Sequence, residues 1–297
     1  MDFSTLEIFA AVASEGGVTR AAGRLGRAQS NISTRLRDLE AELGRDLFRR
    51  DGKRMLLTAE GEVFLGYANH LLSVAAEARG AVVGEVSAGR LRLGAMESTA
   101  AARLPEPLAK FHADYPHVDL QLTTGTTQAI IDQVLDHRLD VGLVAAAPGS
   151  LAGSGVTAEP IWAEDLMLIL PRDHPAALSA SDVRVGAFAA FEFGCAYRRI
   201  GEAWLAGGRA ERPMRVLELG SYHAIIACVA AGAAAAVVPR ALLELAATPP
   251  PVRTTPLQRI ETVLISRSEY RSPLLDALRG ALAASSNLRA RAGAAAA

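Results

Sequence analysis

Short apolar stripes at helical spacing fill the first sixty positions of the chain, and glycines separate them. Gly16-Gly17 ends the first stripe, and a second helix over 20–25 is expected to start from Thr19 as its N-cap. A third helix is predicted over about 30–43. The apolar faces of the first and third helices consist of Leu6, Phe9, Ala10 and Ala13, and of Ile32, Leu36, Leu39 and Leu43. Two short strands then flank Asp51-Gly52, a pair that favours a hairpin turn.

A tight connection at residues 26–29 joins the second and third helices, which makes the pair a helix-turn-helix candidate. The third helix carries side chains that suit base edges in a DNA major groove: Gln29, Ser30, Asn31, Ser33, Thr34 and Arg35. Four further residues are placed for phosphate contacts, which position a protein without specifying sequence: Thr19, Arg50, Lys53 and Arg54. The alternative is a small three-helix bundle with a solvated charged face.

A long helix is predicted from Thr58 to about Val86. Its apolar residues follow the alternating spacing of a coiled-coil seam: Phe64, Ala68, Leu71, Ala75, Ala78 and Val82. The alternative is an ordinary helix that packs on its own domain. We favour the seam, because a segment between two domains has little else to pack against.

Strands alternate with helical stretches over the rest of the chain, a pattern typical of a mostly parallel α/β sheet. Strands are expected near residues 91–95, 118–123, 141–144, 166–170, 216–219, 235–238 and 262–266. Helices are expected near residues 100–115, 127–137, 198–206, 222–231, 242–245 and 273–284. The fold class is therefore α/β with an all-α N-terminal domain.

The charge distribution separates the N-terminal module from the rest. The formal net charge of the chain is −1, yet ten basic and five acidic residues lie between Gly17 and Thr58. A preference for nucleic acid must therefore come from this local patch. Two cysteines form no disulfide framework and no four-cysteine metal site, and neither a signal peptide nor a transmembrane helix is recognisable. We expect a cytoplasmic protein without metal, cofactor or membrane partner.

Small polar residues follow three of the predicted strands, where open α/β sheets bind ligands. The hydroxyls at these junctions belong to Ser98, Thr99, Thr126, Thr127 and Ser221. Hydroxyls and backbone N–H groups at helix starts suit an anion, and Arg198 would add a full positive charge. Glu97 is the only carboxylate beside a junction, so a small carboxylate or similar anion is predicted. Plain N-capping, which needs the same residue types, is the alternative.

Several blocks of the N-terminal module resemble the winged-helix domain of LysR-type transcriptional regulators. They include Gly17-Val-Thr-Arg-Ala-Ala-Gly-Arg-Leu, Gln29-Ser-Asn-Ile-Ser, Asp46-Leu-Phe-Arg-Arg and Leu57-Thr-Ala-Glu-Gly. The similarity continues through Tyr115-Pro-His-Val and the segment 231–239, and so covers nearly the whole chain. The chain departs from the family at Val18, commonly Phe, at Ser30, commonly Pro, and at Thr34, often Arg. These departures concern the operator sequence rather than DNA binding.

The resemblance implies a winged helix-turn-helix over 1–58, a dimerising linker helix over 59–89 and an effector domain over 90–297. The effector domain would resemble periplasmic binding proteins, with lobe one at about 90–164 and 267–290 and lobe two at about 165–266. Its effector would meet the first two junctions and a wall that contains Cys195, Tyr197, Arg198 and Ser221. The implied partners are promoter DNA, a small-molecule effector, a second copy in a dimer or tetramer, and RNA polymerase.

Three other functions compete with an effector-controlled regulator. Cys195, near Arg198, could be a redox-sensing thiol, but Cys228 is 33 residues away in an apolar stretch. A stand-alone solute-binding protein would lack the basic N-terminal module. An enzyme is not expected, because no nucleophile elbow, zinc-protease or P-loop pattern occurs and the histidines do not cluster.

Overall fold

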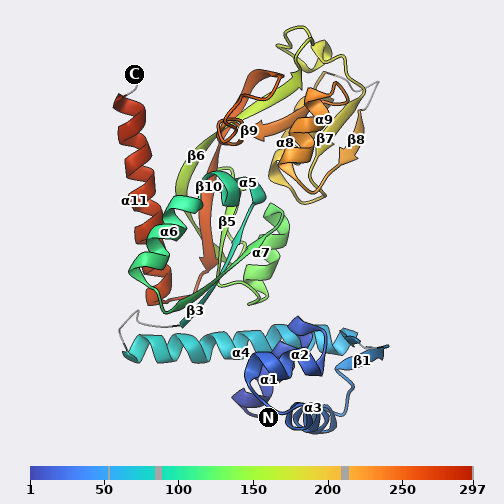
Figure 1. Ribbon diagram of the computed structural model, residues 1–297, viewed down its shortest axis with the longest axis vertical. Helices are drawn as coiled ribbons and strands as arrows, with labels where there is room; N and C mark the ends of the chain where they lie inside the picture. The colour runs from blue at the N-terminus through green and yellow to red at the C-terminus, as the bar shows by residue number, and fades with distance from the viewer. Residues whose placement is uncertain (53, 84–88, 209–213, 296–297) are drawn as a thin grey trace. The chain divides into compact units, whose positions relative to one another are not determined.

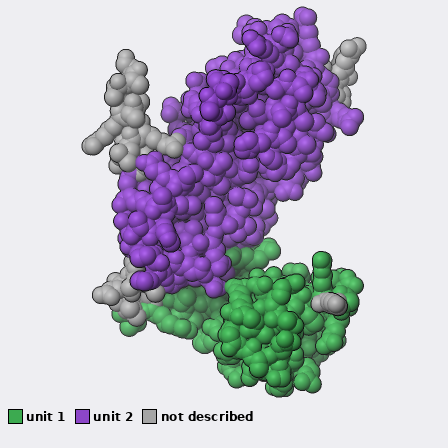
Figure 2. Space-filling model, in the orientation of Figure 1, with its two compact units in different colours: residues 1–84, 136–138 green, residues 85–135, 139–297 purple. Residues whose placement is uncertain are grey.

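Figure 1 shows the computed structural model, which describes residues 1–52, 54–83, 89–208 and 214–295. The chain divides into two compact units (Figure 2): residues 1–84 with 136–138, and residues 85–135 with 139–297. None of the helices in the described ranges has a stretch long and apolar enough to span a bilayer.

The first unit contains four helices and one hairpin. In chain order they are α1 (Phe3–Glu15), α2 (Val18–Leu25), α3 (Gln29–Leu43), β1 (Phe48–Asp51), β2 (Arg54–Leu57) and α4 (Ala59–Val83). Asp2 caps α1 by accepting a hydrogen bond from the Thr5 amide at 2.8 Å. The core centres on Phe9, whose ring contacts Phe48 at 5.2 Å and Phe64 at 5.0 Å between centroids. The hairpin and α4 thus pack on the three-helix bundle.

The turn between α2 and α3 depends on Gly26. This residue has a φ of 62°, in the left-handed region that glycine adopts without strain. Its amide lies within hydrogen-bonding range of the carbonyl oxygens of Ala22 and Gly23. The chain therefore leaves α2 sharply and re-enters a helix at Gln29, as the helix-turn-helix prediction requires.

Four details of the first unit differ from the predictions. Helix α2 starts after Gly17, so Thr19 lies inside the helix and is not its N-cap. In α1 the fully buried positions include Ile8 and Val12, and Ala10 and Ala13 are only half-buried. Leu43 is exposed, because α3 ends there at Gly44. Asp51 pairs with Arg54 as the last residue of β1, so it does not lie in the turn where the sequence placed it.

Helix α4 presents two different apolar faces. Phe64 and Ala68 pack into the core of their own unit, as the ordinary-helix alternative expects. A second face leaves its apolar side chains exposed: Val63, Tyr67, Leu71, Val74 and Val82. The predicted seam therefore mixes both faces. Spacings of four, four and three residues between Val63 and Val74 show that the exposed stripe has its own helical register.

The second unit is built on a mixed sheet, not on the mostly parallel one that the sequence predicts. Its strands are β3 (Gly89–Ala95), β4 (Val118–Thr124), β5 (Val141–Ala146), β6 (Val156–Pro171), β9 (Ala236–Pro239) and β10 (Val252–Arg267). They lie in the order β4-β3-β5-β10-β6-β9. The first three are parallel, whereas β10 is antiparallel to both β5 and β6. A separate parallel pair joins β7 (Ala187–Ala190) to β8 (Arg215–Glu218).

Helices cover this sheet and the β7–β8 pair. They are α5 (Glu97–Ala102), α6 (Pro105–Asp114), α7 (Thr127–Leu135), α8 (Ala196–Ala206), α9 (Tyr222–Ala230), α10 (Arg240–Leu243) and α11 (Pro273–Ala295), with a short 3-10 turn at Ala180–Asp182. One hydrophobic core lies under α6 and α11 and includes Phe111 and Leu278. A larger core lies under α7, α8 and α9 and includes Ile130, Phe188 and Ile225. This is a two-lobed α/β architecture whose long strands β6 and β10 run from one lobe into the other.

Two sequence predictions for this unit are wrong in extent. A single helix over 100–115 is in fact two, because the chain turns at Arg103-Leu104 before Pro105 starts α6. The strands at 166–170 and 262–266 are the ends of sixteen-residue strands. Pro160 and Pro256 in the missed halves hid the strand pattern, and the register shifts beside Pro256.

Candidate functional sites

The exposed face of α3 carries most of the predicted base-contacting residues. Gln29, Ser30, Asn31 and Thr34 are exposed, and Ser33 is half-buried. The opposite face is buried through Ile32, Leu36 and Leu39. Thr19 also lies exposed, with its hydroxyl 3.2 Å from Gln29 Oε1. An exposed polar helix after a tight turn matches what major-groove recognition requires.

Arg35 does not belong to that face. Its Nη1 donates to Asp2 Oδ2 at 2.7 Å and to Thr5 Oγ1 at 3.2 Å, so the guanidinium ties α3 to the start of α1. The Thr5 amide and then Arg35 lower the pKa of Asp2 to about 2. The prediction that Arg35 reads bases therefore conflicts with its position, because the side chain points toward α1.

Arg37 is a residue that the sequence analysis left out of the site. It is exposed on α3, and its guanidinium lies 3.3 Å from the Ser33 carbonyl and 3.5 Å from Thr34 Oγ1. Positions 30, 33, 34 and 37 share one helical face, since residues three, four and seven apart align on a helix. That spacing from Ser30 was the signal that could have identified Arg37.

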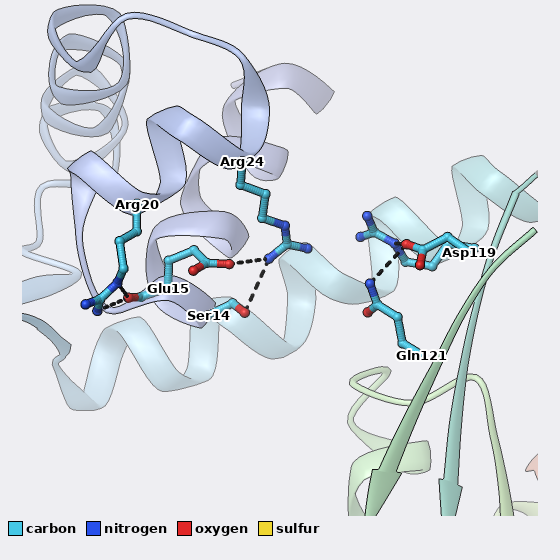
Figure 3. Close-up of polar contacts among 7 residues, drawn as sticks. Ser14, Glu15, Arg20, Arg24, Asp119 and Gln121 are labelled. Atoms are coloured by element: carbon cyan, nitrogen blue, oxygen red, sulfur yellow. Dashed lines mark hydrogen bonds and ion pairs between the residues drawn. The ribbon is translucent and has the colours of Figure 1, made fainter.

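The basic residues of the first unit fall into two groups. In one group the guanidinium groups tie helices together: Arg20 donates to the Glu15 carbonyl, and Arg24 lies 3.2 Å from Glu15 Oε1 and 3.4 Å from Ser14 Oγ (Figure 3). In the other group, Arg50 and Arg54 stand exposed on the β1–β2 hairpin. Lys53 lies outside the described residues.

A cleft in the second unit brings together four separated segments. It encloses about 230 Å³ of space, part of it open to solvent. The lining residues are Met96, Glu97, Gly125, Thr126, Thr127, Phe191, Cys195 and Tyr222. They come from the starts of α5, α7 and α9 and from the segment before α8. This is the type of location, at strand ends and helix starts, where α/β proteins bind small molecules.

The second predicted junction forms one wall of the cleft. Thr126 caps α7, because its Oγ1 accepts from the Ala129 amide at 3.3 Å. The Gln128 amide donates to the Gly194 carbonyl at 3.2 Å, which fixes the segment before α8 against α7. Thr127 is half-buried, and among the described residues its hydroxyl contacts the Met96 sulfur alone, at 3.5 Å. Thr127 is therefore the hydroxyl best placed to exchange its contact for a ligand.

The first junction behaves differently from the prediction. Ser98 and Thr99 are each 2% exposed and are not among the residues that line the cleft. The physical reason is that α5 begins at Glu97, so both side chains belong to its first turn and point into the protein. Tyr197 is also buried, and burial raises its pKa well above the ordinary value.

Arg198 and Ser221 lie outside the lining as well. The Arg198 guanidinium is held by Glu202 at 2.8 Å and Glu218 at 2.7 Å, and it also donates to the Phe191 carbonyl at 3.1 Å. The sequence predicts that Arg198 supplies the positive charge for an anionic ligand. In the structure, two carboxylates already pair with that charge. Ser221 precedes α9 without a side-chain capping bond.

Cys195 lines the cleft as a weakly acidic thiol. Burial raises its pKa, and its Sγ lies 4.0 Å from the Tyr222 hydroxyl. A redox-sensing thiol needs a lowered pKa, so this environment disfavours the redox alternative. Among the described residues, no three His, Cys, Asp or Glu side chains gather to hold a metal ion.

Five lining residues were not among the predicted site residues. Gly125 and Tyr222 lie in two of the predicted polar junctions, whereas Met96 and Phe191 lie outside them. The rings of Phe191 and Tyr222 lie 4.6 Å apart at 47°. Glu97 was visible only as a neighbour of a polar junction. Its oxygen Oε2 is shielded from solvent and has no hydrogen-bond partner in the described part of the chain.

Comparisons with known families agree with both halves of the molecule. Residues 3–62 match the family described as "Bacterial regulatory helix-turn-helix protein, lysR family", and residues 84–286 match "LysR substrate binding domain". The fold and sites therefore define a helix-turn-helix transcriptional regulator with an effector-binding domain. The chain belongs to the LysR family of transcriptional regulators, and this confirms the resemblance and the predicted fold class.

Individual relatives cover most of the chain. The regulator GltR of Bacillus subtilis is 35% identical and spans 82% of this chain and 81% of its own length. The regulator SoxR of an Arthrobacter species is 30% identical and spans 91% and 92%. These relatives are named as regulators, not as enzymes.

Solved structures support the same assignment. Full-length CbnR bound to its target DNA is 27% identical, with a TM-score of 0.62, and the match covers 96% of this chain and all of that one. A full-length OxyR variant from Pseudomonas aeruginosa has a TM-score of 0.75 at 22% identity, over 97% and 95% of the two chains. At that identity the OxyR match shows the shared fold alone.

Proposed function

We propose that this regulator binds a small-molecule effector in the cleft of its second unit and that binding changes its action on a promoter operator. The observation that carries the proposal is the convergence of four chain segments on one small, partly open space. In a hydrophobic core, apolar side chains would fill such a space. Here the Thr127 hydroxyl and the Glu97 carboxylate line it instead. An effector can shift the regulator only if it binds one conformation more tightly than another.

The effector carries a carboxylate or similar anionic group that binds at Thr127. Of the amides in the first turn of α7, those of Gln128 and Ala129 already have partners. The Thr127 hydroxyl has only a sulfur contact, and its amide lies at the positive end of the helix. A carboxylate oxygen that accepts from this hydroxyl and amide would gain two charge-assisted hydrogen bonds.

A thermal-shift screen of small carboxylates, amines and sugars tests this site. We expect stabilising compounds for the wild type and loss of that stabilisation in Thr127→Val, which keeps the volume and removes the hydroxyl. Thr123→Val is the matched control, because Thr123 is exposed on β4 and does not line the cleft. The proposal fails if no compound stabilises the protein, or if both variants respond as the wild type does.

On DNA we propose that the α3 face containing Ser30, Ser33 and Thr34 reads bases, together with Gln29 and Asn31. Thr19, Arg50, Arg54 and the sequence-predicted Lys53 contact phosphates. Arg37 joins the base-reading face in place of Arg35. Support comes from the exposure of Gln29, Ser30, Asn31, Thr34 and Arg37 on α3, from the exposure of Thr19, Arg50 and Arg54, and from the CbnR relative, whose structure contains its target DNA.

We also propose self-assembly through the exposed stripe of α4. Five apolar side chains on one helical face would be costly to leave in water, and a second copy of the same helix can cover them. A dimer built in this way supplies paired half-site readers, and two dimers would form a tetramer on DNA. RNA polymerase remains the expected downstream partner.

A further inference from the structure

The cleft carries a negative charge and no lining positive charge. Glu97, the first residue of α5, is the only charged residue among those that line it in the described chain. Its Oε2 is shielded from water and lacks a hydrogen-bond partner among the described residues. A shielded carboxylate oxygen without a donor is costly, and a bound donor would remove that cost.

The interactions that Glu97 already makes account for only part of its charge. The backbone N–H of Tyr222, at the start of α9, and the exposed His223 both favour the ionised form. Burial outweighs them and raises the pKa of this carboxyl. The helix start of α9 therefore does not fully compensate the carboxylate, whose second oxygen has no donor among the described residues.

Aromatic side chains stand in the same cleft. Phe191 and Tyr222 both line it, with ring centroids 4.6 Å apart and planes inclined at 47°. Aromatic faces attract ammonium groups through their negative π charge. The Arg198 guanidinium donates to the Phe191 carbonyl from outside the lining, which holds the backbone at this residue. One carboxylate beside two aromatic rings is a combination that binds an organic cation.

The size of the cleft limits the ligand. The space among its lining residues is about 230 Å³, and this figure includes the part that is open to solvent. The Thr127 hydroxyl lines the same space as Glu97. A ligand that reaches both must therefore carry its two polar groups close together.

We propose that the effector is a small zwitterion whose ammonium group donates to Glu97 Oε2 beside the Phe191 and Tyr222 rings. Its carboxylate faces Thr127, so this inference rests on the proposed function and refines its ligand class. The sequence prediction of a simple anion then describes only one end of the molecule.

Matched ligand pairs test the inference by calorimetry on the full-length protein. Each pair is an amino acid and the same acid without its amine: glycine and acetate, L-alanine and propionate, L-valine and 3-methylbutanoate, L-glutamate and glutarate. We expect at least one amino acid to bind about tenfold or more tightly than its partner, as hydrogen bonds to charged groups warrant. Glu97→Gln should abolish that ratio while the melting temperature stays close to the wild type.

Glu192→Gln is the control, because Glu192 is exposed beside Phe191 and does not line the cleft. It should keep the ratio. The ratio is measured within each variant, so a general loss of folding cannot imitate its disappearance.

The inference is overturned if no amino acid binds better than its partner, or if Glu97→Gln keeps the preference. When the partner acids bind and Thr127→Val weakens them, the proposed function survives that result and only the ammonium assignment falls. When nothing in the panel binds, or when Thr127→Val binds as tightly as the wild type, the proposed function and the ammonium assignment are both contradicted.

Discussion

The proposed DNA-reading face and the proposed effector cleft differ in how the chain builds them. The reading face lies on one helix, α3, within nine consecutive residues from Gln29 to Arg37. The cleft takes its wall from four segments between Met96 and Tyr222. A local site is visible in a sequence pattern, whereas a site assembled by tertiary packing is not. The predictions below probe this contrast, beginning with the largest expected effect.

The largest effect that we predict concerns self-assembly through the exposed stripe of α4. Val74→Asp places a charge in the middle of the exposed α4 stripe. If a second copy covers that stripe, burying the charge costs several kcal/mol and the dimer dissociates. Light scattering should then show the monomer mass. Ala76→Asp makes the same change at an exposed position off the stripe and should leave the oligomer intact; an intact Val74→Asp oligomer would mean that another surface joins the copies.

Gly61 in α4 lies so close to the backbone that precedes the hairpin that a larger residue there should destabilise the first unit. A Cβ at Gly61 would lie 2.1 Å from the Leu47 carbonyl oxygen, so Gly61→Ala must displace backbone. We expect a loss of about 1–3 kcal/mol in the stability of the first unit, measured by denaturant unfolding. Gly66→Ala in the same helix meets no atom within 4 Å and should be neutral or stabilising. Equal effects of the two variants would refute this packing.

Specific DNA binding should separate Arg37 from Arg35. Arg37→Ala is expected to cost about 1–3 kcal/mol on an operator and much less on random duplex, the mark of a base contact. Arg35→Ala should leave the difference between operator and random DNA unchanged, because the Arg35 guanidinium is bound to Asp2. Fluorescence anisotropy on both duplexes measures this. Loss of specificity in Arg35→Ala alone would restore the original assignment.

Acid sensitivity is the smallest effect that we predict. The pKa of Asp2 is lowered to about 2 from the ordinary 3.8, so the folded state favours its charged form. The resulting stability is present above the ordinary pKa and is lost as the pH falls toward about 2. Asp2→Asn keeps an N-cap acceptor but removes the charge. Its melting temperature should fall less steeply than that of the wild type between pH about 5 and 2, and parallel curves would contradict the prediction.

Much of the first unit could be predicted because its determinants are local. Apolar spacing and helix-ending glycines located α1, α2 and α3, and the Asp51-Gly52 pair located the hairpin. The contact of Arg35 with Asp2 could not be foreseen, because Asp2 lies 33 residues away in sequence. The predicted α4 seam combined residues of two faces, because this helix carries both a core face and an exposed apolar face.

The cleft was only partly predictable for a related reason. Thr126 and Thr127 were found because hydroxyls that follow a strand mark a helix start. Ser98 and Thr99 were misplaced because α5 begins earlier than its pattern suggested. Phe191 and Tyr222 become pocket walls only when α8 and α9 pack, and no local pattern distinguishes such residues from core.

Reciprocal linkage between effector and DNA is the most direct test of an effector-controlled regulator. The measurement is the Kd of full-length protein for an operator selected from random duplexes, with and without a saturating compound that requires Thr127. Coupling between two sites is commonly about 5–150-fold, so the Kd should change at least about fivefold. In Thr127→Val the same compound should leave the Kd unchanged. An identical Kd with and without the compound in the wild type would contradict the account.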